Sequence, residues 1–555
     1  MNKTLKLNNI DLKIGLAFSG GGFRASSFSL GVLSYLNEVS VGNVSLLSKV
    51  YALSTISGGT IAGARYALGI KNGESFNTIY WSLYDFMSDT DLIGISLNNL
   101  VSKKEKDDSR PKSLITAFAD AYDLHLFNKE KFGILQDESN PIHLKNISFN
   151  ATEFQNALQF RFQTTEKIKN PYPDEPERGI IGNHYYRIPE EIAKDIRMAD
   201  ILAASSCFPG GFEPINFPTD FVFSQSDPIH SFIDIKNLPV GLMDGGIVDN
   251  QGIEPLLLAE KRMKRNRAAE HRPRSEQNEF DLLIISDVTS PYMDGYKPNN
   301  RKKLNFWRRL TFRRLIVINL IILLASLAGI VFSVKNNLQL WSIVFAVLIT
   351  TNIFLYLTLL LIKKLPRKFQ VPAAFTKPLS KLLKVQFAEY ENMILNRSNS
   401  LLKMTNEVFL KHIRRLNYNK IFQDKSWKNR RIMNGIYELR LEEEKLRTRI
   451  ENEKLSTELT PSAAIQKVAS TASSMGTTLW FTQEELNEKN MLNSIIACGQ
   501  FTMCWNLLEY IYKIKNDAEN TNPKHTQLLQ IESQLLAHWQ RFNANPFWMV
   551  NEIKR

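Results

Sequence analysis

The stretch that decides the fold is IGLAFSGGGFR, from Ile14 to Arg24. Its first five residues are an apolar run, and the run breaks at three consecutive glycines. Phe28, Val32 and Leu36 follow at helical spacing. The stretch therefore predicts a strand, a glycine turn and a helix, which together form the opening unit of an α/β fold.

Two further apolar runs repeat this pattern. Val50–Ile56 breaks at Ser57-Gly58-Gly59, before a helix-compatible stretch over residues 60–68. Residues 282–286 (LLIIS) end at Asp287 and are typical of a strand that is buried on both faces. Because these strands alternate with helices, we expect an α/β domain with a mainly parallel sheet.

The glycine turn has three interpretations. Gly20, Gly22 and Ala25 satisfy the dinucleotide pattern G-x-G-x-x-A, but the second expected strand lacks the acid that this pattern requires. A phosphate-binding loop of the Walker type needs Gly-Lys-Ser/Thr, which is absent from the turn. The third interpretation is an oxyanion hole, in which glycine N–H groups face a developing negative charge.

Ser57 is the candidate nucleophile for such a site. It directly follows a predicted strand and has small neighbours. A serine on a nucleophile elbow needs small neighbours because its hydroxyl must be accessible to the substrate. The strict pattern is G-x-S-x-G, and Thr55 replaces its first glycine. A glycine-rich helix start without chemistry is an equally common interpretation.

Asp244 is the candidate base, in the stretch MDGGIVDN from Met243 to Asn250. The default interpretation of Asp-Gly-Gly is a structural turn. None of the eight histidines lies in these motifs, so a Ser–His–Asp triad is hard to assemble. A Ser–Asp dyad is the simpler arrangement, because the carboxylate can accept the serine proton directly.

In this order, SGGGFR, TISGG and MDGGIVDN resemble the motifs of the patatin-like phospholipase family. The segment AASSCFP, residues 203–209, resembles the small-residue segment between nucleophile and aspartate in that family. The resemblance covers residues 10–295. It implies a three-layer α/β/α hydrolase core with a mainly parallel sheet, hydrolysis of lipid acyl esters, and no metal or other cofactor.

The resemblance also implies roles for individual residues. Ser57 would be the nucleophile and Asp244 the base, with Gly21 and Gly22 as oxyanion donors. Gly20 would shape the turn, and Arg24 would support the loop. The remaining motif positions flank the elbow and the aspartate; they are Thr55, Gly58, Gly59, Gly245 and Gly246.

The composition of the whole 555-residue chain limits its class. With 44% hydrophobic and 23% charged residues it has ordinary globular usage, and three cysteines are too few for a disulfide framework. The net charge is +13, yet residues 297–314 and 363–384 together hold fifteen basic residues and no acid. Because the basicity is confined to these two runs, we expect no nucleic-acid partner.

Two uncharged apolar runs lie between the basic ones, at residues 315–334 and 340–362. Each is long enough to cross a bilayer as a helix, so we expect a two-helix transmembrane hairpin rather than a buried hairpin of a soluble core. Both outer ends are basic, which places both termini and the catalytic domain in the cytosol. The N-terminal stretch lacks the apolar region of a signal peptide.

The expected organisation has four parts. They are a catalytic core over residues 1–295, the hairpin with its basic flanks over 296–384, a mostly helical charged arm over 385–465, and C-terminal helices over 466–555. The stretch from Thr478 to Tyr512 resembles the closing helices of bacterial patatin-like enzymes, so we expect the last part to complete the catalytic domain.

We therefore expect a multi-pass membrane protein that hydrolyses lipid acyl esters at the cytosolic leaflet. Its partners would be the membrane lipid substrate and the bilayer itself. The sequence does not decide whether the chain also forms a homo-oligomer. The alternatives are a catalytically silent membrane scaffold of the same fold and a membrane-damaging defence effector.

Overall fold

A computed structural model describes residues 12–102, 110–172, 175–223, 227–229, 240–269, 279–290, 305–368, 384–440, 443–452, 455–517 and 528–555. The chain divides into two compact units. The first comprises Met1–Met293 and Glu407–Arg555, and the second comprises Asp294–Asn406.

The first unit is built on one sheet, which has ten strands among the described residues. Its main path runs β12-β11-β1-β4-β5-β6-β7-β8, and β10 pairs with both β5 and β9. The strands are β1 (Ile14–Phe18), β4 (Val50–Ile56), β5 (Asn146–Glu153), β6 (Leu158–Thr164), β7 (Ile181–Gly182), β8 (Arg187–Ile188), β9 (Ile215–Phe217), β10 (Val240–Asp244), β11 (Leu282–Asp287) and β12 (Arg431–Gly435).

The part of the sheet from β12 to β5 is parallel. The predicted strands Ile14–Phe18 and Val50–Ile56 are confirmed, and the third continues one residue further, to Asp287. Every residue of β1 and β11 is buried, as their continuous apolar runs predict. The other strands of the path, β6 to β8, are antiparallel.

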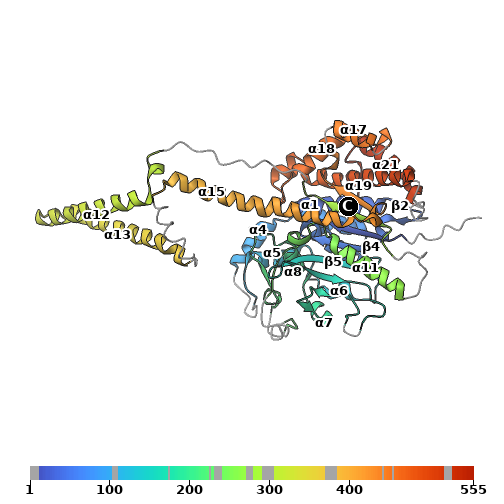
Figure 1. Ribbon diagram of the computed structural model, residues 1–555, viewed down its shortest axis with the longest axis horizontal. Helices are drawn as coiled ribbons and strands as arrows, with labels where there is room; N and C mark the ends of the chain where they lie inside the picture. Colours follow the sequence, from blue (N-terminus) through green and yellow to red (C-terminus); the bar gives the residue numbers. More distant parts are fainter. Residues whose placement is uncertain are drawn as a thin grey trace, which may run out of the picture. The chain divides into compact units, whose positions relative to one another are not determined.

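Helices cover both faces of this sheet (Figure 1). On β11, Leu282 and Ile284 join a large core with helices α1 (Gly22–Glu38) and α19 (Met491–Asn516). Leu283 and Ile285 join a smaller core on the opposite face, with α11 (Ile253–Ala269) and α16 (Leu410–Phe422). The alternation places the sheet between two helical layers, as the expected mixed α/β class requires.

Helices α1 and α19 pack in backbone contact where two glycines meet. A Cβ at Gly31 would overlap the carbonyl oxygen of Ile496, and a Cβ at Gly499 would overlap that of Phe28. Gln500 adds a hydrogen bond of 2.9 Å from its amide to the hydroxyl of Ser34. The helical C-terminal region is therefore packed directly on the first helix of the chain.

The remaining longer helices of the first unit surround these. They are α2 (Gly58–Lys71), α3 (Phe76–Asp89), α4 (Leu92–Val101), α5 (Leu114–His125), α8 (Met198–Ser206), α17 (Glu443–Asn452), α18 (Ala463–Ser474) and α21 (Glu532–Ala544). Shorter ones include α6 (Gly133–Gln136), α7 (Glu190–Ala193), α10 (Gly246–Asp249) and α22 (Trp548–Glu552).

Strand β12 departs from the expected mostly helical arm over residues 385–465. Arg431–Gly435 pairs in parallel with β11 and forms the edge of the sheet. The stretch RIMNG contains only two apolar residues and ends in glycine, so its local pattern does not reveal a strand.

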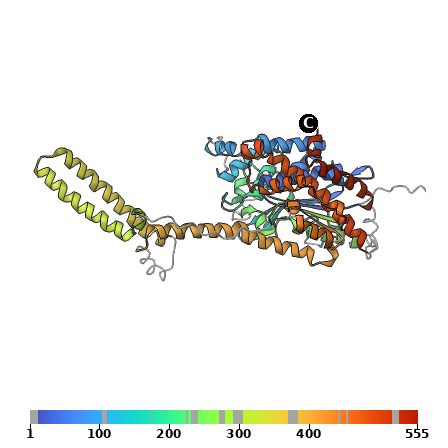
Figure 2. The ribbon, with the colours of Figure 1, turned by 90° about the horizontal axis from the view of Figure 1, so that it is seen from above.

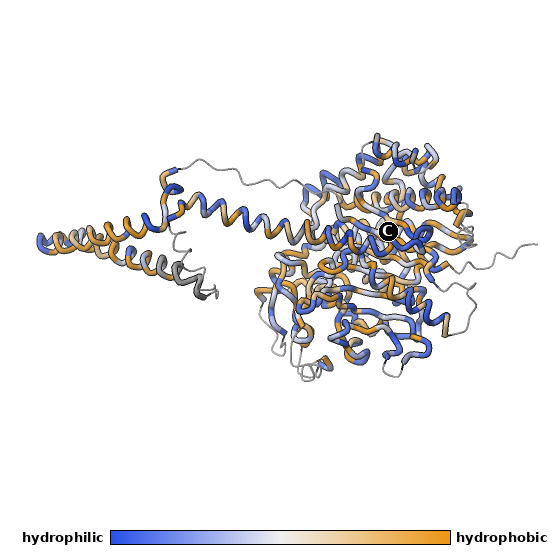
Figure 3. The backbone as a smooth tube through the Cα atoms, viewed as in Figure 1, coloured by the Kyte–Doolittle hydropathy of each residue, from blue (hydrophilic) through white to orange (hydrophobic). Residues whose placement is uncertain are grey.

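The second unit contains two long apolar helices, α12 (Phe312–Lys335) and α13 (Gln339–Lys368), followed by α15 (Phe387–Lys403). α12 and α13 are joined by a short turn and lie side by side (Figure 2). Both are apolar along most of their length, as the colouring of Figure 3 shows. They extend beyond the expected spans, residues 315–334 and 340–362. Six of the expected basic flanking residues lie outside the described residues: Lys297, Arg301, Lys302, Lys303, Lys377 and Lys381.

Candidate active site

Ser57 lies on a tight turn between β4 and α2. Its backbone has φ 51° and ψ −121°, a region that costs a residue other than glycine about 1–3 kcal/mol. Gly58 and Gly59 follow, and a Cβ on Gly58 would overlap the carbonyl oxygen of Gly22, so the elbow touches the glycine loop backbone to backbone. This strand–turn–helix geometry is that of a nucleophile elbow.

Asp244 is the last residue of β10 and is held through its backbone. Its N–H donates to the carbonyl of Cys207 at 2.9 Å, and its carbonyl accepts a hydrogen bond of 2.8 Å from the hydroxyl of Thr152. Its Oδ1 accepts a hydrogen bond of 2.7 Å from the N–H of Gly246. The carboxylate is therefore oriented by its own turn.

The pairing of β5 explains why Ser57 and Asp244 meet. Along one edge, β5 pairs first with β4, up to Ile56 opposite Asn150, and then with antiparallel β10, from Asp244 opposite Ala151. The two strands thus end at adjacent positions of the same edge. Burial raises the pKa of Asp244 to about 6, and hydrogen bonds from the Ser57 hydroxyl and the Gly246 N–H oppose this rise.

The glycine loop ends at the N-terminus of α1. Gly20 donates its N–H to the carbonyl of Asn250 at 3.1 Å, so this group is occupied. Gly21 (φ 145°) and Gly22 (φ 58°) have backbone angles that favour glycine. Among the described residues, none accepts a hydrogen bond from the N–H of Gly21 or Gly22. These two groups are available to an oxyanion.

The N-termini of α1 and α2 both lie at this site. Neither helix has an acidic residue in its first turn. Because a helix N-terminus carries a partial positive charge, both ends favour a negative charge that develops beside Ser57.

The C-terminal region contributes to the glycine loop. The carbonyl of Thr478 accepts a hydrogen bond of 2.7 Å from the N–H of Phe23, and a Cβ on Gly22 would overlap the same oxygen. Arg24 is buried and donates to the carbonyl of Met475 at 2.6 Å and to the hydroxyl of Tyr437 at 3.3 Å. Arg24 therefore joins the loop to two segments that lie more than 400 residues away in the sequence.

Asp249, the other acid of MDGGIVDN, has a different environment. Its carboxylate accepts hydrogen bonds from the N–H groups of Gln251 and Glu254 and from the amide of Asn417. Burial raises its pKa to about 6 as well. These hydrogen bonds are typical of a residue that caps the start of α11. A hydrogen bond from the Ser57 hydroxyl lowers the pKa of Asp244 but is not among the causes that act on Asp249.

Two of the cavities among the described residues of the first unit bear on where the site lies. One, of about 560 Å³, lies at the carboxyl ends of β11 and β12 and is lined by Asp287, Tyr418 and Tyr437 among others. Burial would raise the pKa of Asp287, but Arg414 and Tyr418, which bond to it at 2.7 and 2.6 Å, hold that pKa below its usual value. The cavity is next to the glycine loop, because Tyr437 contacts Arg24.

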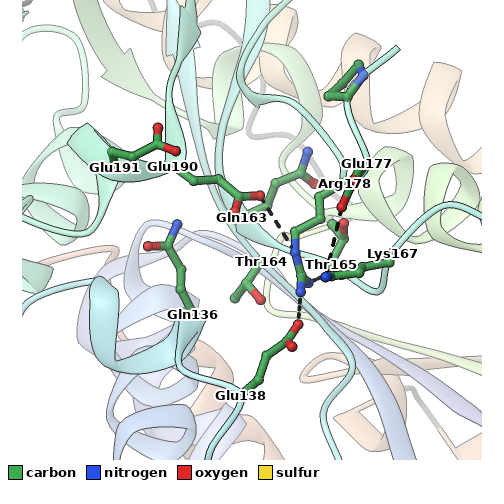
Figure 4. Close-up of a pocket in the computed structure, with 11 residues that line it drawn as sticks. Gln136, Glu138, Gln163, Thr164, Thr165, Lys167, Glu177, Arg178, Glu190 and Glu191 are labelled. Carbon is green, nitrogen blue, oxygen red and sulfur yellow. Dashed lines mark hydrogen bonds and ion pairs between the residues drawn. The ribbon is translucent and has the colours of Figure 1, made fainter. Parts of the chain in front are cut away.

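The other cavity, of about 510 Å³, lies beside β6 and has residues of α6 and α7 in its lining (Figure 4). Thr164, in its lining, pairs with Ile147 near the start of β5, whereas Ser57 follows the end of β4. Its charged groups pair with one another: Arg178 with Glu138 and Glu190, and Lys167 with Glu177. Its lining contains no residue of the glycine loop, of the Ser57 turn or of the Asp244 turn.

Several residues of the site were missed by sequence reasoning. Ser205 accepts a hydrogen bond of 2.9 Å from the N–H of Ser57, and Asn150, Asn250 and Thr478 hold neighbouring backbone. Ser205 lies in the segment 203–209 that the family resemblance singled out, which was the one signal that could have found it. Among the described residues, no group of three or more His, Cys, Asp or Glu side chains is placed to hold a metal ion.

The first half of the chain is similar to a known family. Residues 16–257 match the family model described as patatin-like phospholipase. The matched range extends from β1 into α11 and contains the glycine loop, Ser57 and Asp244. No curated protein matches the chain.

Proposed function

We propose that this protein is a membrane-anchored serine acyl hydrolase that cleaves acyl esters of lipids with Ser57 and Asp244. The observation that carries the proposal is the strained Ser57 turn beside a buried carboxyl whose pKa is about 6. The match of residues 16–257 to patatin-like phospholipases supports the substrate class.

The chemistry follows from the positions of these groups. The Ser57 oxygen attacks the ester carbonyl while Asp244 takes its proton, and the N–H groups of Gly21 and Gly22 stabilise the oxyanion. Asp244 then protonates the leaving alcohol, which leaves an acyl group on Ser57. Water, activated by Asp244, releases the fatty acid. A pKa of about 6 brings the base closer to neutral pH than an ordinary aspartate.

The exposure pattern of α12 and α13 supports membrane anchoring. The most apolar windows of the two helices are only 11% and 6% buried, whereas the core helix of a soluble protein would be mostly buried. The side chains buried between them are polar: Asn319, Ser326 and Ser333 on α12 and Asn352 on α13. This arrangement suits a bilayer, where polar groups pair between helices and apolar groups face lipid.

Polar side chains form hydrogen bonds between these helices. The Asn319 amide donates to Oδ1 of Asn352 at 2.9 Å, and the hydroxyls of Ser333 and Ser342 lie 2.8 Å apart. The arginines at the start of α12 (Arg313 and Arg314) suit a cytosolic interface with anionic headgroups.

Lipid-product analysis tests the chemistry. Purified protein in phospholipid vesicles should release fatty acid, and a fluorophosphonate should label Ser57. Ser57→Ala and Asp244→Ala should each remove nearly all hydrolysis, and the double variant should be scarcely worse, because the two residues act as one unit. Hydrolysis that persists unchanged in Ser57→Ala would refute the assignment. A folded wild type without hydrolysis or labelling would favour the silent scaffold.

Cysteine accessibility tests the topology. The native Cys207, Cys498 and Cys504 are buried, so background labelling should be low. Asn336→Cys, in the exposed turn between α12 and α13, should react with an impermeant thiol reagent from outside intact cells. Glu488→Cys, exposed in the first unit, should react only after the cells are permeabilised. The reverse pattern would invert the orientation, and release of the protein without detergent would contradict the anchor.

A further inference from the structure

Thr55, which replaces the first glycine of the elbow pattern, contacts helix α2. The Thr55 hydroxyl lies 3.0 Å from the hydroxyl of Thr60, and its methyl group packs against Gly63 on α2. Thr55 and Thr60 are both fully buried. The threonine that replaces the elbow's first glycine thus bonds to the helix that follows the elbow.

The chain of hydroxyls continues from Thr60 to Ser205, at the C-terminal end of α8. The Thr60 and Ser205 hydroxyls lie 2.9 Å apart. The Ser205 hydroxyl donates to the carbonyl of Asn150 on β5 at 2.8 Å and accepts the N–H of Ser57 at 2.9 Å. One fully buried hydroxyl therefore contacts the elbow, the helix that follows it and the strand beside it.

Counting protons fixes the direction of these bonds. A hydroxyl has one hydrogen to donate and two lone pairs to accept with. Ser205 gives its hydrogen to the Asn150 carbonyl, which can only accept. Thr60 must then donate to Ser205, and Thr55 must donate to Thr60. The three hydroxyls therefore donate in sequence, from Thr55 to Thr60 to Ser205 to the Asn150 carbonyl, and Ser205 also accepts the N–H of Ser57. In such a chain each hydrogen bond polarises and strengthens the next.

We infer that Ser205 is a positioning residue, and that the hydroxyls of Thr55 and Thr60 support it in holding Ser57 in its reactive conformation. The inference rests on the proposed hydrolase function. The N–H of Ser57 belongs to a residue with φ 51°, which surrounding contacts must hold in place.

The role of the Ser205 side chain can be separated from that of its backbone. The carbonyl of Ser205 accepts the N–H of Gly245 at 3.3 Å, and that of Cys207 accepts the N–H of Asp244 at 2.9 Å. Both bonds survive a change of side chain. Removing the hydroxyl therefore removes the hydrogen bond that holds Ser57, while the backbone bonds to Asp244 and Gly245 remain.

Three variants measure this effect. Ser205→Ala should lower kcat on the order of 10²-fold, the loss expected when a reacting group is misplaced by about 1 Å, and should change KM little. Its rate of fluorophosphonate labelling at Ser57 should fall in parallel. Thr60→Val keeps the shape of the side chain but cannot donate, and should lose on the order of 10-fold in kcat, the equivalent of one hydrogen bond. Thr60→Ser restores the donor and should regain most of that rate.

Ser206→Ala is the matched control. Ser206 is the next residue, is equally buried, and donates to the Leu202 carbonyl of its own helix. It should keep the wild-type kcat and labelling rate. Thermal melting of each variant separates a loss of positioning from unfolding, and Thr60→Val keeps the test decisive if Ser205→Ala fails to fold.

The possible outcomes separate the two proposals. If the wild type is active and both Ser205→Ala and Thr60→Val keep its kcat and labelling rate, the positioning role is overturned and the hydrolase function stands. If Ser206→Ala loses as much as Ser205→Ala, the effect lies in the packing of α8, and the hydroxyl chain is overturned as its cause. If the wild type neither hydrolyses esters nor reacts with fluorophosphonate, the proposed function fails and the positioning role fails with it.

Discussion

Asp244 is a buried carboxyl, and we expect its burial both to favour its proposed role as the base and to oppose folding. An aspartate at its ordinary pKa is a weak base at neutral pH, and burial raises the pKa of Asp244 to about 6. The base must be ionised to accept the Ser57 proton. We therefore expect kcat/KM to rise with pH, with a midpoint near pH 6, which a pH–rate profile on a soluble ester can measure. A profile that is flat from pH 5 to 8 would exclude Asp244 as the base.

The same pKa predicts a stability effect. Between about pH 4 and pH 6 the folded chain binds a proton that the unfolded chain has lost, so stability falls as the pH rises through this window. Two pKa units correspond to roughly 3 kcal/mol. Asp244→Asn cannot titrate, so it should be inactive yet up to about 3 kcal/mol more stable than the wild type at pH 8, with the difference vanishing near pH 4.

Melting curves of the two proteins at pH 4, 6 and 8 measure this difference. The pKa of Asp249 is raised in both proteins, so its contribution cancels in the comparison. A stability difference that does not vary with pH would show that Asp244 has an ordinary pKa.

Ser57 and Asp244 could be singled out from the sequence because each is flanked by glycines in a short motif. Ser205 carries no such signal, since its bonds reach residues that are 55 to 148 positions away. Asn150 and Thr478 are similar cases, because they act through partners on distant segments. The two residues proposed to react can thus be recognised from short motifs, whereas the residues that hold them in place are defined only by the folded sheet.

Among the elements, the glycine loop before α1 has little room for an added side chain. A Cβ on Gly22 would overlap the Thr478 carbonyl, which already accepts the Phe23 N–H. Gly22→Ala should displace one or both segments and cost on the order of 10²–10³ in kcat, the loss expected for one oxyanion donor.

Gly73→Ala provides the control for Gly22→Ala. Gly73 also has a positive φ, 75°, but a Cβ there meets nothing within 4 Å. It should therefore share the backbone strain and keep the activity. Equal activity of the two variants in an ester assay would place the oxyanion donors elsewhere.

The strands differ in how well the sequence reveals them. β1, β4 and β11 are continuous apolar runs because helices cover both faces of the parallel sheet, and such runs are visible in the sequence. β12 lies at the edge and alternates half-buried with buried residues, so it was missed. The junction of β4 and β10 on β5 was also not predictable, because it depends on long-range pairing.

At the scale of the whole molecule, the first unit draws on both ends of the chain. In α19, Ile495, Phe501 and Trp505 are fully buried, and burying each is worth about 1.5–3 kcal/mol. Their sum approaches the net stability of a typical domain, about 5–15 kcal/mol. Truncation at residue 465 removes α19 and the carbonyls that bond Phe23 and Arg24. The product should be unfolded and inactive by circular dichroism and ester assay, although Ser57 and Asp244 remain.

Excision of the apolar hairpin should have the opposite effect. Asn319 pairs with Asn352, so residue 315 lies level with about residue 356, and residue 362 is roughly 9 Å further along its helix. A short flexible linker can therefore replace residues 315–362. The product should be soluble without detergent and should hydrolyse dispersed short-chain esters at a rate near that of the full chain. On vesicles it should be much slower, because the anchor no longer holds the site at the lipid surface. An active truncation together with an inactive excision would reverse this assignment: the C-terminal helices would then be a separate domain, and the hairpin would belong to the catalytic core.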